Sequence, residues 1–241
     1  MSKPRLSKLI SECNDVPPCP MPILALDLDG TLIDSVPDLA AAINRVMAAR
    51  SLAPFTRPEV AAMVGDGVAM LVRRAFAARG REPDADAIAD YIADYTAHAV
   101  VETRPFPGVL PALEQLRAEG WRLAICTNKP EAATHALLRA LGIDALFAAV
   151  GGGDSFPVRK PDPAHLLATL RAAGGEARPE CAVMVGDHVN DVRAAHGAGL
   201  PCIFAAWGYG APAMAEGAEA VAASFTEVPA LARRLLQQRT A

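Results

Sequence analysis

Two aspartates two positions apart, Asp27 and Asp29, are the residues of this sequence best placed to do chemistry. They directly follow the apolar run ILAL at residues 23–26. Such a run predicts a buried strand of a parallel sheet, and open α/β sheets bind ligands at the carboxyl ends of their strands. A surface turn needs only one aspartate and does not account for the strand that delivers both. Two carboxylates there are costly unless a cation meets them, so we expect a cationic partner.

A second pair of acids follows a second apolar run. Asp187 and Asp191 lie four positions apart, after the run AVMV at residues 182–185. The start of a helix would bring both side chains to one face. Either carboxylate alone could simply cap that helix. The similar segment Gly65-Asp66-Gly67 follows no apolar run, and we expect it to be a loop.

Two further segments supply a hydroxyl and a lysine. Thr127 begins the sequence TNKP after another apolar run, and Lys160 begins the sequence KPDP at a predicted helix start. Each segment alone is a weak signal, because KPDP is also ordinary chemistry for starting a helix. All four segments, however, stand at strand ends or helix starts that would meet at one edge of a sheet. Acids for a metal, with a hydroxyl and a lysine for an anion, indicate a phosphate site.

Short apolar runs and helical patterns alternate along most of the chain. The expected strands cover residues 23–26, 123–126, 145–150, 182–185 and 202–204. The expected helices between them cover residues 109–119, 131–141, 163–173 and 189–197. This alternation predicts an α/β fold with a parallel sheet and helices on both of its faces.

One segment, residues 37–104, breaks the alternation, because it contains helical patterns and no convincing strand. Thr56 followed by Glu59 resembles a capping box, and a long periodic stretch begins at Asp84. The strand pattern resumes only after the turn-rich sequence PFPG at residues 105–108. The sequence therefore predicts a helical module inserted after the first strand.

The composition favours a soluble chain that acts on a small molecule. The 241 residues are 52% hydrophobic, carry a formal net charge of −4 and contain no dense basic cluster. No apolar run reaches the ~20 residues that a bilayer crossing needs. We therefore expect neither a nucleic acid nor a membrane as partner. The five cysteines are scattered and odd in number. This argues against a disulfide framework and favours a reducing compartment, the cytoplasm.

The four segments, in this order, resemble the four motifs of the haloacid dehalogenase-like hydrolases. The resemblance rests on DLDGT at residues 27–31, Thr127, Lys160 and GDHVND at residues 186–191. It covers the chain from Met21 nearly to the end. It implies a Rossmann-like parallel-sheet core with an inserted helical cap domain.

The resemblance also implies how the chain is divided. Residues 21–36 and 105–241 would form the core, and residues 37–104 would form the helical cap. Residues 1–20 have a basic start but lack the apolar centre of a signal peptide, and we expect them to be a weakly ordered tail.

Carried over residue by residue, the resemblance implies phosphoryl transfer in two steps. Asp27 attacks phosphorus and forms an aspartyl-phosphate. Asp29 protonates the leaving alkoxide and later deprotonates the hydrolytic water. Mg²⁺ is the implied cofactor, held by Asp27, Asp187 and the backbone carbonyl of Asp29.

The resemblance further implies a set of substrate-binding residues in the motifs and the cap. These are Thr127, Asn128, Lys160, Gly65, Gly67 and Arg73. Thr127 and Lys160 would hold the phosphoryl oxygens, with Lys160 acting as a point charge. Asp191 would orient Lys160 or a metal-bound water. Arg73 and Arg74 are the cap cations best suited to a substrate carboxylate, although such arginines are most often a solvated helix face.

Variation within the family narrows the expected reaction. The dehalogenases and the phosphonate-cleaving branch lack the second acid of the first motif, which is present here as Asp29. The sugar phosphomutases typically have valine where this chain has Thr31. Hydrolysis of a phosphomonoester on a small phosphorylated metabolite is what remains.

The longer pattern resembles the bacterial phosphoglycolate phosphatases and implies hydrolysis of 2-phosphoglycolate to glycolate and phosphate. The resemblance rests on residues 35–39, 64–67, 159–163 and 207–210. Asp66 departs from it, and its charge would repel a substrate carboxylate if it faced the site. A sugar-phosphate phosphatase (acting, for example, on N-acetylmuramic acid 6-phosphate), a phosphomutase and a non-catalytic binding or regulatory module stay open as alternatives. We expect a monomer or a homodimer.

Overall fold

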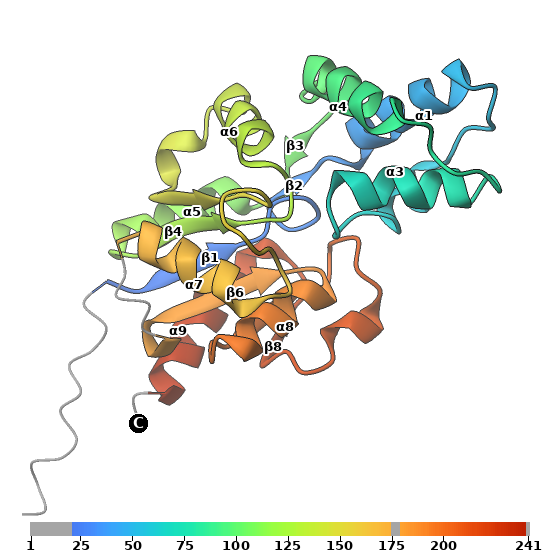
Figure 1. The fold of residues 1–241 in the computed structure, drawn as a ribbon. Helices are drawn as coiled ribbons and strands as arrows, with labels where there is room; N and C mark the ends of the chain where they lie inside the picture. Colours follow the sequence, from blue (N-terminus) through green and yellow to red (C-terminus); the bar gives the residue numbers. More distant parts are fainter. Residues whose placement is uncertain (1–20, 175–178, 240–241) are drawn as a thin grey trace, which may run out of the picture.

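A six-stranded parallel sheet forms the centre of the computed structural model, which describes residues 21–174 and 179–239 (Figure 1). The strand order is β5-β4-β1-β6-β7-β8. The strands are β1 (Ile23–Leu26), β4 (Arg122–Cys126), β5 (Ala149–Gly151), β6 (Ala182–Gly186), β7 (Cys202–Ala205) and β8 (Ala220–Ala222). The predicted α/β fold with a parallel sheet is confirmed. The expected tail, residues 1–20, lies outside the described residues.

Helices cover both faces of this sheet. One face packs against α5 (Val109–Ala118), α6 (Glu131–Ala140) and α9 (Val228–Arg239), and the other against α7 (Pro163–Ala172) and α8 (Val189–Gly197). Successive residues of β1 alternate between the two sides: Leu24 and Leu26 belong to the first hydrophobic cluster, and Ile23 and Ala25 to the second. Because both faces are covered, a strand that is apolar throughout is stable here.

Four helices gather apart from the sheet around a hydrophobic cluster of their own (Figure 1). They are α1 (Val36–Ala49), α2 (Arg57–Ala61), α3 (Val68–Ala77) and α4 (Ala87–His98). The predicted capping box is confirmed: Thr56 accepts a hydrogen bond from the backbone of Glu59, whose side chain accepts one from the backbone of Thr56. Two short antiparallel strands, β2 (Ile33–Asp34) and β3 (Arg104–Pro105), lie where the chain enters and leaves these helices.

Several elements differ from the sequence-based expectation or were not expected. The strand predicted over residues 145–150 is instead a 3₁₀ helix, Asp144–Leu146, followed by the shorter β5. No counterpart of β2, β3, β8 or α9 is among the elements expected from the sequence. The two-residue strands are too short to show a period of two, and β8 is only three residues long. Further 3₁₀ helices cover Pro179–Cys181, Pro212–Ala215 and Phe225–Glu227.

Two further expectations concern disulfide bonds and membrane-spanning helices. Cys126 and Cys202 are free and buried, and in such a place a cysteine packs as a small apolar side chain. Cys181 is disulfide-bonded, a bond that the odd cysteine count did not predict. Across residues 21–174 and 179–239, every helix is too short or too polar to cross a bilayer.

Candidate active site

The carboxyl ends of three neighbouring strands bring the predicted site residues to one edge of the sheet. β1 pairs in parallel with β4 on one side and with β6 on the other, and Leu26 lies opposite Ile125 and Val185. The residues that follow these strand ends, Asp27, Thr127 and Asp187, are all buried. Backbone hydrogen bonds hold the first two in place: Asp27 N–H donates to Val185 (2.9 Å) and Thr127 N–H to Gly151 (2.9 Å). These three segments therefore meet at one edge of the sheet, as the sequence predicts.

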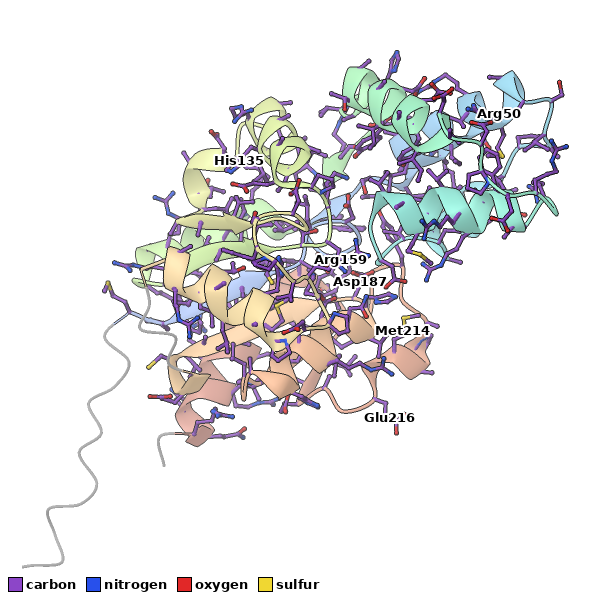
Figure 2. All side chains as sticks on the ribbon, viewed as in Figure 1. Arg50, His135, Arg159, Asp187, Met214 and Glu216 are labelled. Atoms are coloured by element: carbon purple, nitrogen blue, oxygen red, sulfur yellow. The ribbon has the colours of Figure 1, made fainter. Side chains whose placement is uncertain are left out.

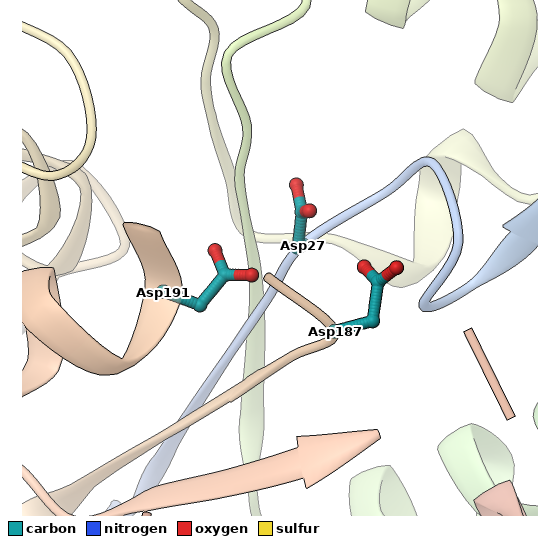
Figure 3. A group of neighbouring side chains, drawn as sticks. All are labelled: Asp27, Asp187 and Asp191. Carbon is teal, nitrogen blue, oxygen red and sulfur yellow. The ribbon is translucent and has the colours of Figure 1, made fainter. Parts of the chain in front are cut away.

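Three buried carboxylates form a group that fits a metal ion. One oxygen each of Asp27, Asp187 and Asp191 lies within 4.8 Å of the other two (Figure 3). Burial, with the nearby charges of Asp27 and Asp191, raises the pKa of Asp187 well above its usual range. The group thus has more negative charge than its surroundings neutralise. Carboxylate oxygens are the ligands that hard divalent cations prefer, so the residues suit such an ion.

Hydrogen bonds orient the carboxylate of Asp187 within this group. It accepts a bond from the Thr31 hydroxyl (3.0 Å) and one from the Tyr209 backbone (2.7 Å). Tyr209 lies in the segment 207–210, and the sequence alone does not indicate this contact. Gly30 has a positive φ of 87°, and an added Cβ would lie 2.4 Å from an Asp187 oxygen. The turn after β1 therefore needs glycine to let Asp187 approach.

Lys160 is the cation of this group. Its ammonium lies 2.8 Å from Asp27 and 2.6 Å from Asp191. Burial acts to lower the pKa of Lys160, but the charges of Asp191 and Asp27 outweigh it and raise the pKa above its usual value. Lys160 is therefore positively charged beside Asp27. Because one lysine faces three carboxylates, the group can still take up the positive charge of a metal ion.

The carboxylate of Asp29 lies outside the group of Asp27, Asp187 and Asp191 and has other partners. Its carboxylate accepts hydrogen bonds from the Ser35 hydroxyl (2.5 Å) and from the Lys129 ammonium (3.1 Å to each oxygen). Lys129 also donates to the hydroxyl of Tyr95 in α4 (3.0 Å). Lys129 is not among the site residues expected from the sequence. Its place in the TNKP segment was the only signal for it, whereas Tyr95 carried none.

The turn before α3 lies directly on the sheet edge. The Gly65 carbonyl accepts hydrogen bonds from the side chains of Asn128 (2.9 Å) and Asn190 (3.4 Å). Gly65 has a φ of 119°, and a Cβ there would lie 2.7 Å from the His188 ring. A Cβ at Gly67 would lie 3.1 Å from the Asn128 carbonyl oxygen. Both glycines thus allow a close contact between the turn and the motifs.

The carboxylate of Asp66, whose charge would repel a substrate carboxylate if it faced the site, is paired with two other side chains. Its carboxylate accepts a hydrogen bond from Asn190 (2.7 Å) and forms an ion pair with Arg74. Burial alone would raise the pKa of Asp66, but these two partners outweigh it and lower the pKa.

Arg73 is exposed on α3, so the structure does not bring this candidate to the sheet edge. Figure 2 shows Asp187 and Arg159 where the sheet edge faces the four helices.

A cavity lies between the sheet edge and the helices. Its polar wall consists of Asp27, Asp29, Thr127, Asn128 and Lys129. Its opposite wall is largely apolar and includes Leu39, Val68, Leu71 and Tyr91. The free space is about 450 Å³, including the part that is open to solvent. A small molecule with one strongly charged end fits this division of the walls.

Comparisons with known proteins agree with this geometry. The sequence profile of the haloacid dehalogenase-like hydrolases matches residues 21–199. A phosphoglycolate phosphatase of Cereibacter sphaeroides (strain ATCC 17029 / ATH 2.4.9) is 42% identical over 221 residues, covering 90% of this chain and 100% of the relative. A phosphoglycolate phosphatase of Rhodospirillum rubrum is 43% identical over 211 residues, covering 84% of this chain and 87% of the relative.

Solved structures share the fold. The crystal structure of a predicted phosphoglycolate phosphatase from Haemophilus somnus 129PT has a TM-score of 0.81 at 31% identity, covering 88% of this chain and 98% of that one. CbbY from Rhodobacter sphaeroides, in complex with phosphate, has a TM-score of 0.74 at 28% identity, covering 86% and 96%. Together with the sequence matches, they confirm the expected family and the expected enzyme class, a phosphatase. The chain belongs to the haloacid dehalogenase-like hydrolases.

Proposed function

We propose that this protein is a Mg²⁺-dependent phosphomonoester hydrolase whose nucleophile is Asp27 and whose substrate is 2-phosphoglycolate. The observation that carries the proposal is the place of Asp27. It stands at the end of the central strand, 2.8 Å from Lys160 and within the group of three carboxylates. A nucleophile needs a cation that attracts the phosphate to it, and Lys160 supplies one.

The proposed reaction has two steps with a covalent intermediate. A carboxylate oxygen of Asp27 bonds to phosphorus, while the bond from phosphorus to the ester oxygen breaks and Asp29 gives that oxygen a proton. Asp29 then takes a proton from water, whose oxygen attacks phosphorus and releases phosphate from Asp27. Asp29 is suited to both steps because it lines the same cavity as Asp27 and is held by Ser35 and Lys129.

The proposed cofactor is Mg²⁺, bound through Asp27, Asp187 and the backbone carbonyl of Asp29, with Asp191 adjoining. When bound, the ion would neutralise the carboxylates and so allow a phosphate dianion to approach Asp27. Thr127 and Lys160 would hold the phosphoryl oxygens, and Asp191 would orient Lys160, to which it lies 2.6 Å away.

The choice of substrate and the domain division are part of the proposal. The helices of residues 37–104 would act as a cap that closes the site above the core, residues 21–36 and 105–241. Support for 2-phosphoglycolate comes from the named relatives and from the small, partly apolar cavity. A sugar phosphate such as N-acetylmuramic acid 6-phosphate and a phosphomutase reaction are rival assignments. A non-catalytic module is disfavoured because all the motif positions carry their reactive side chains.

A panel of phosphate esters assayed with and without a chelator tests this proposal. We expect hydrolysis to stop with the chelator and return with Mg²⁺, and kcat/KM to be highest for 2-phosphoglycolate. A higher kcat/KM for a sugar phosphate would replace the substrate. A phosphate transferred between sugar positions would indicate a mutase. No turnover of any ester would favour the binding module.

A further inference from the structure

We propose that Tyr91 and Lys129 form the subsite that binds the second acidic group of the substrate, a carboxylate close to the phosphate ester. This inference deepens the proposed function and rests on it. It assigns the recognition of the carboxylate to α4 and to the end of β4, instead of to the arginines of α3.

The hydroxyl of Tyr91 is the first observation. Tyr91 lies in α4, is fully buried and lines the cavity that also contains Asp27. Its hydroxyl has no hydrogen-bond partner among the residues that the structure describes. Buried hydroxyls are nearly always paired, so an unpaired one on a residue that lines the cavity is available to a ligand group. The ring stacks in parallel on Tyr95 at 6.1 Å, which holds it in place.

The charge of Lys129 is the second observation. Within the described part of the chain, Lys129 is the one cationic side chain among the residues that line this cavity. It is buried, and the Asp29 charge and the Tyr95 hydroxyl outweigh burial and raise its pKa above the usual value. Lys129 therefore carries a positive charge at the wall of a cavity whose other charged groups are Asp27 and Asp29. For a second anionic group, beyond the phosphate that Lys160 would hold, Lys129 is the cation among the lining residues that can give a charge-assisted bond.

The chemistry of the ester places a carboxylate within reach of Lys129. Asp29 must contact the ester oxygen to give it a proton, and Lys129 lies 3.1 Å from both oxygens of Asp29. A carboxylate joined to that ester oxygen through a single CH₂ group is only two bonds away from it. It would therefore lie beside Lys129. The apolar side chains of Leu39 and Leu71 on the opposite wall suit the CH₂ group and would exclude a hydrated sugar.

The arginines of α3 are less suited to this task. Arg73 is exposed, and Arg74 already binds Asp66 and the Met63 carbonyl (2.9 Å). Engaging either in the cavity would require breaking those contacts or moving the helix. Lys129 lines the cavity while it binds Asp29 and Tyr95, and the Tyr91 hydroxyl has no contact among the described residues to break.

Binding measurements in an Asp27→Asn background test the subsite without relying on turnover. The dissociation constants of 2-phosphoglycolate and of ethyl phosphate, which lacks the carboxylate, are compared with Mg²⁺ present. We expect the preference for 2-phosphoglycolate to fall by about 10-fold with Tyr91→Phe and by about 10- to 100-fold with Lys129→Gln, the range of a hydrogen bond to a charged group. Ethyl phosphate reports any general damage, including damage to Asp29, because both ligands share the phosphate site.

Arg73→Gln is the matched control, since it also removes one positive charge. It should leave the preference unchanged. The inference is overturned if Tyr91→Phe and Lys129→Gln, both folded as judged by cooperative thermal unfolding, keep the original preference. It is also overturned if Arg73→Gln abolishes the preference, or if the Asp27→Asn protein binds both ligands equally. Failure of the proposed function has a different signature, because then the otherwise unaltered enzyme hydrolyses no ester, or hydrolyses another ester with a higher kcat/KM, whatever the binding preference.

Discussion

The two walls of the cavity are built on different physical principles. On the sheet edge, buried charges face each other directly: Lys160 lies between Asp27 and Asp191, and Asp187 is held by backbone and hydroxyl donors. On the helical side, the wall is mostly apolar, and its one buried hydroxyl, Tyr91, has no partner among the described residues. Buried carboxylates with one lysine among them, which can hold a cation, suit a ligand group that never varies, the phosphate. An apolar wall with a single free polar group suits selection by size and by one added charge.

The two sides also differ in how firmly they are placed. The sheet edge follows strands that pair on both sides, and Asp27, Thr127 and Asp187 are held by hydrogen bonds from within the core. The helical side meets the edge through side-chain bonds to one turn, mainly from Asn128 and Asn190 to Gly65 and Asp66. We therefore expect substitutions at the edge to remove chemistry and substitutions at the turn to weaken binding.

The largest effect should come from the nucleophile. Asp27→Asn replaces the attacking carboxylate with an amide that cannot form the aspartyl-phosphate, and kcat should fall on the order of 10⁶-fold. Steady-state and single-turnover assays measure the loss, and thermal unfolding checks that the variant folds. Asp144→Asn, at an exposed aspartate, is the control. Substantial turnover by Asp27→Asn would exclude Asp27 as nucleophile.

Asp29→Ala should have the next largest effect, because one residue serves both steps. General acid–base assistance is typically worth ~10²–10⁴-fold, so we expect a loss of kcat in that range. If phosphorylation limits the rate, the loss should shrink for p-nitrophenyl phosphate, whose leaving group needs no proton. Ser35→Ala removes only the 2.5 Å donor to Asp29 and should cost less. An equal loss for every ester would point to water activation or to a structural role instead.

The sheet edge was predictable from the sequence, and the helical wall largely was not. Asp27, Thr127, Lys160 and Asp187 each follow or adjoin an apolar run or a helix start, and parallel strands necessarily bring such positions together. Tyr91 has no such local signal, because a tyrosine at helical spacing reads as a core residue. Its place at the cavity depends on how separate helices pack above the sheet, which no short pattern encodes.

The partners of single charged residues were not predictable from the sequence either. The sequence predicted that Asp66 would repel an acidic substrate if it faced the site and that Arg73 or Arg74 would attract it. In the structure, Asp66 is paired with Arg74 and Asn190, and Arg73 is exposed. Arg74 is one residue away from Arg73, so only the rotation of α3 decides which of the two guanidinium groups turns toward the loop. A shift of one position along a helix lies below the resolution of a sequence pattern.

The smallest effect should come from the bonds that join the turn to the sheet edge. Asn190→Ala removes the donor to Asp66 (2.7 Å) and the longer one to Gly65 (3.4 Å), while Asp66 keeps Arg74. At about 1 kcal/mol for one net hydrogen bond, KM should rise roughly 5-fold, with kcat changed less. Asn44→Ala is a matched control, because Asn44 bonds only to the Phe55 backbone (2.7 and 2.9 Å) among the described contacts within the helices. It should lower the melting temperature without raising KM. If both variants raise KM equally, general loosening of the helices explains the effect, and the turn contributes nothing specific to binding.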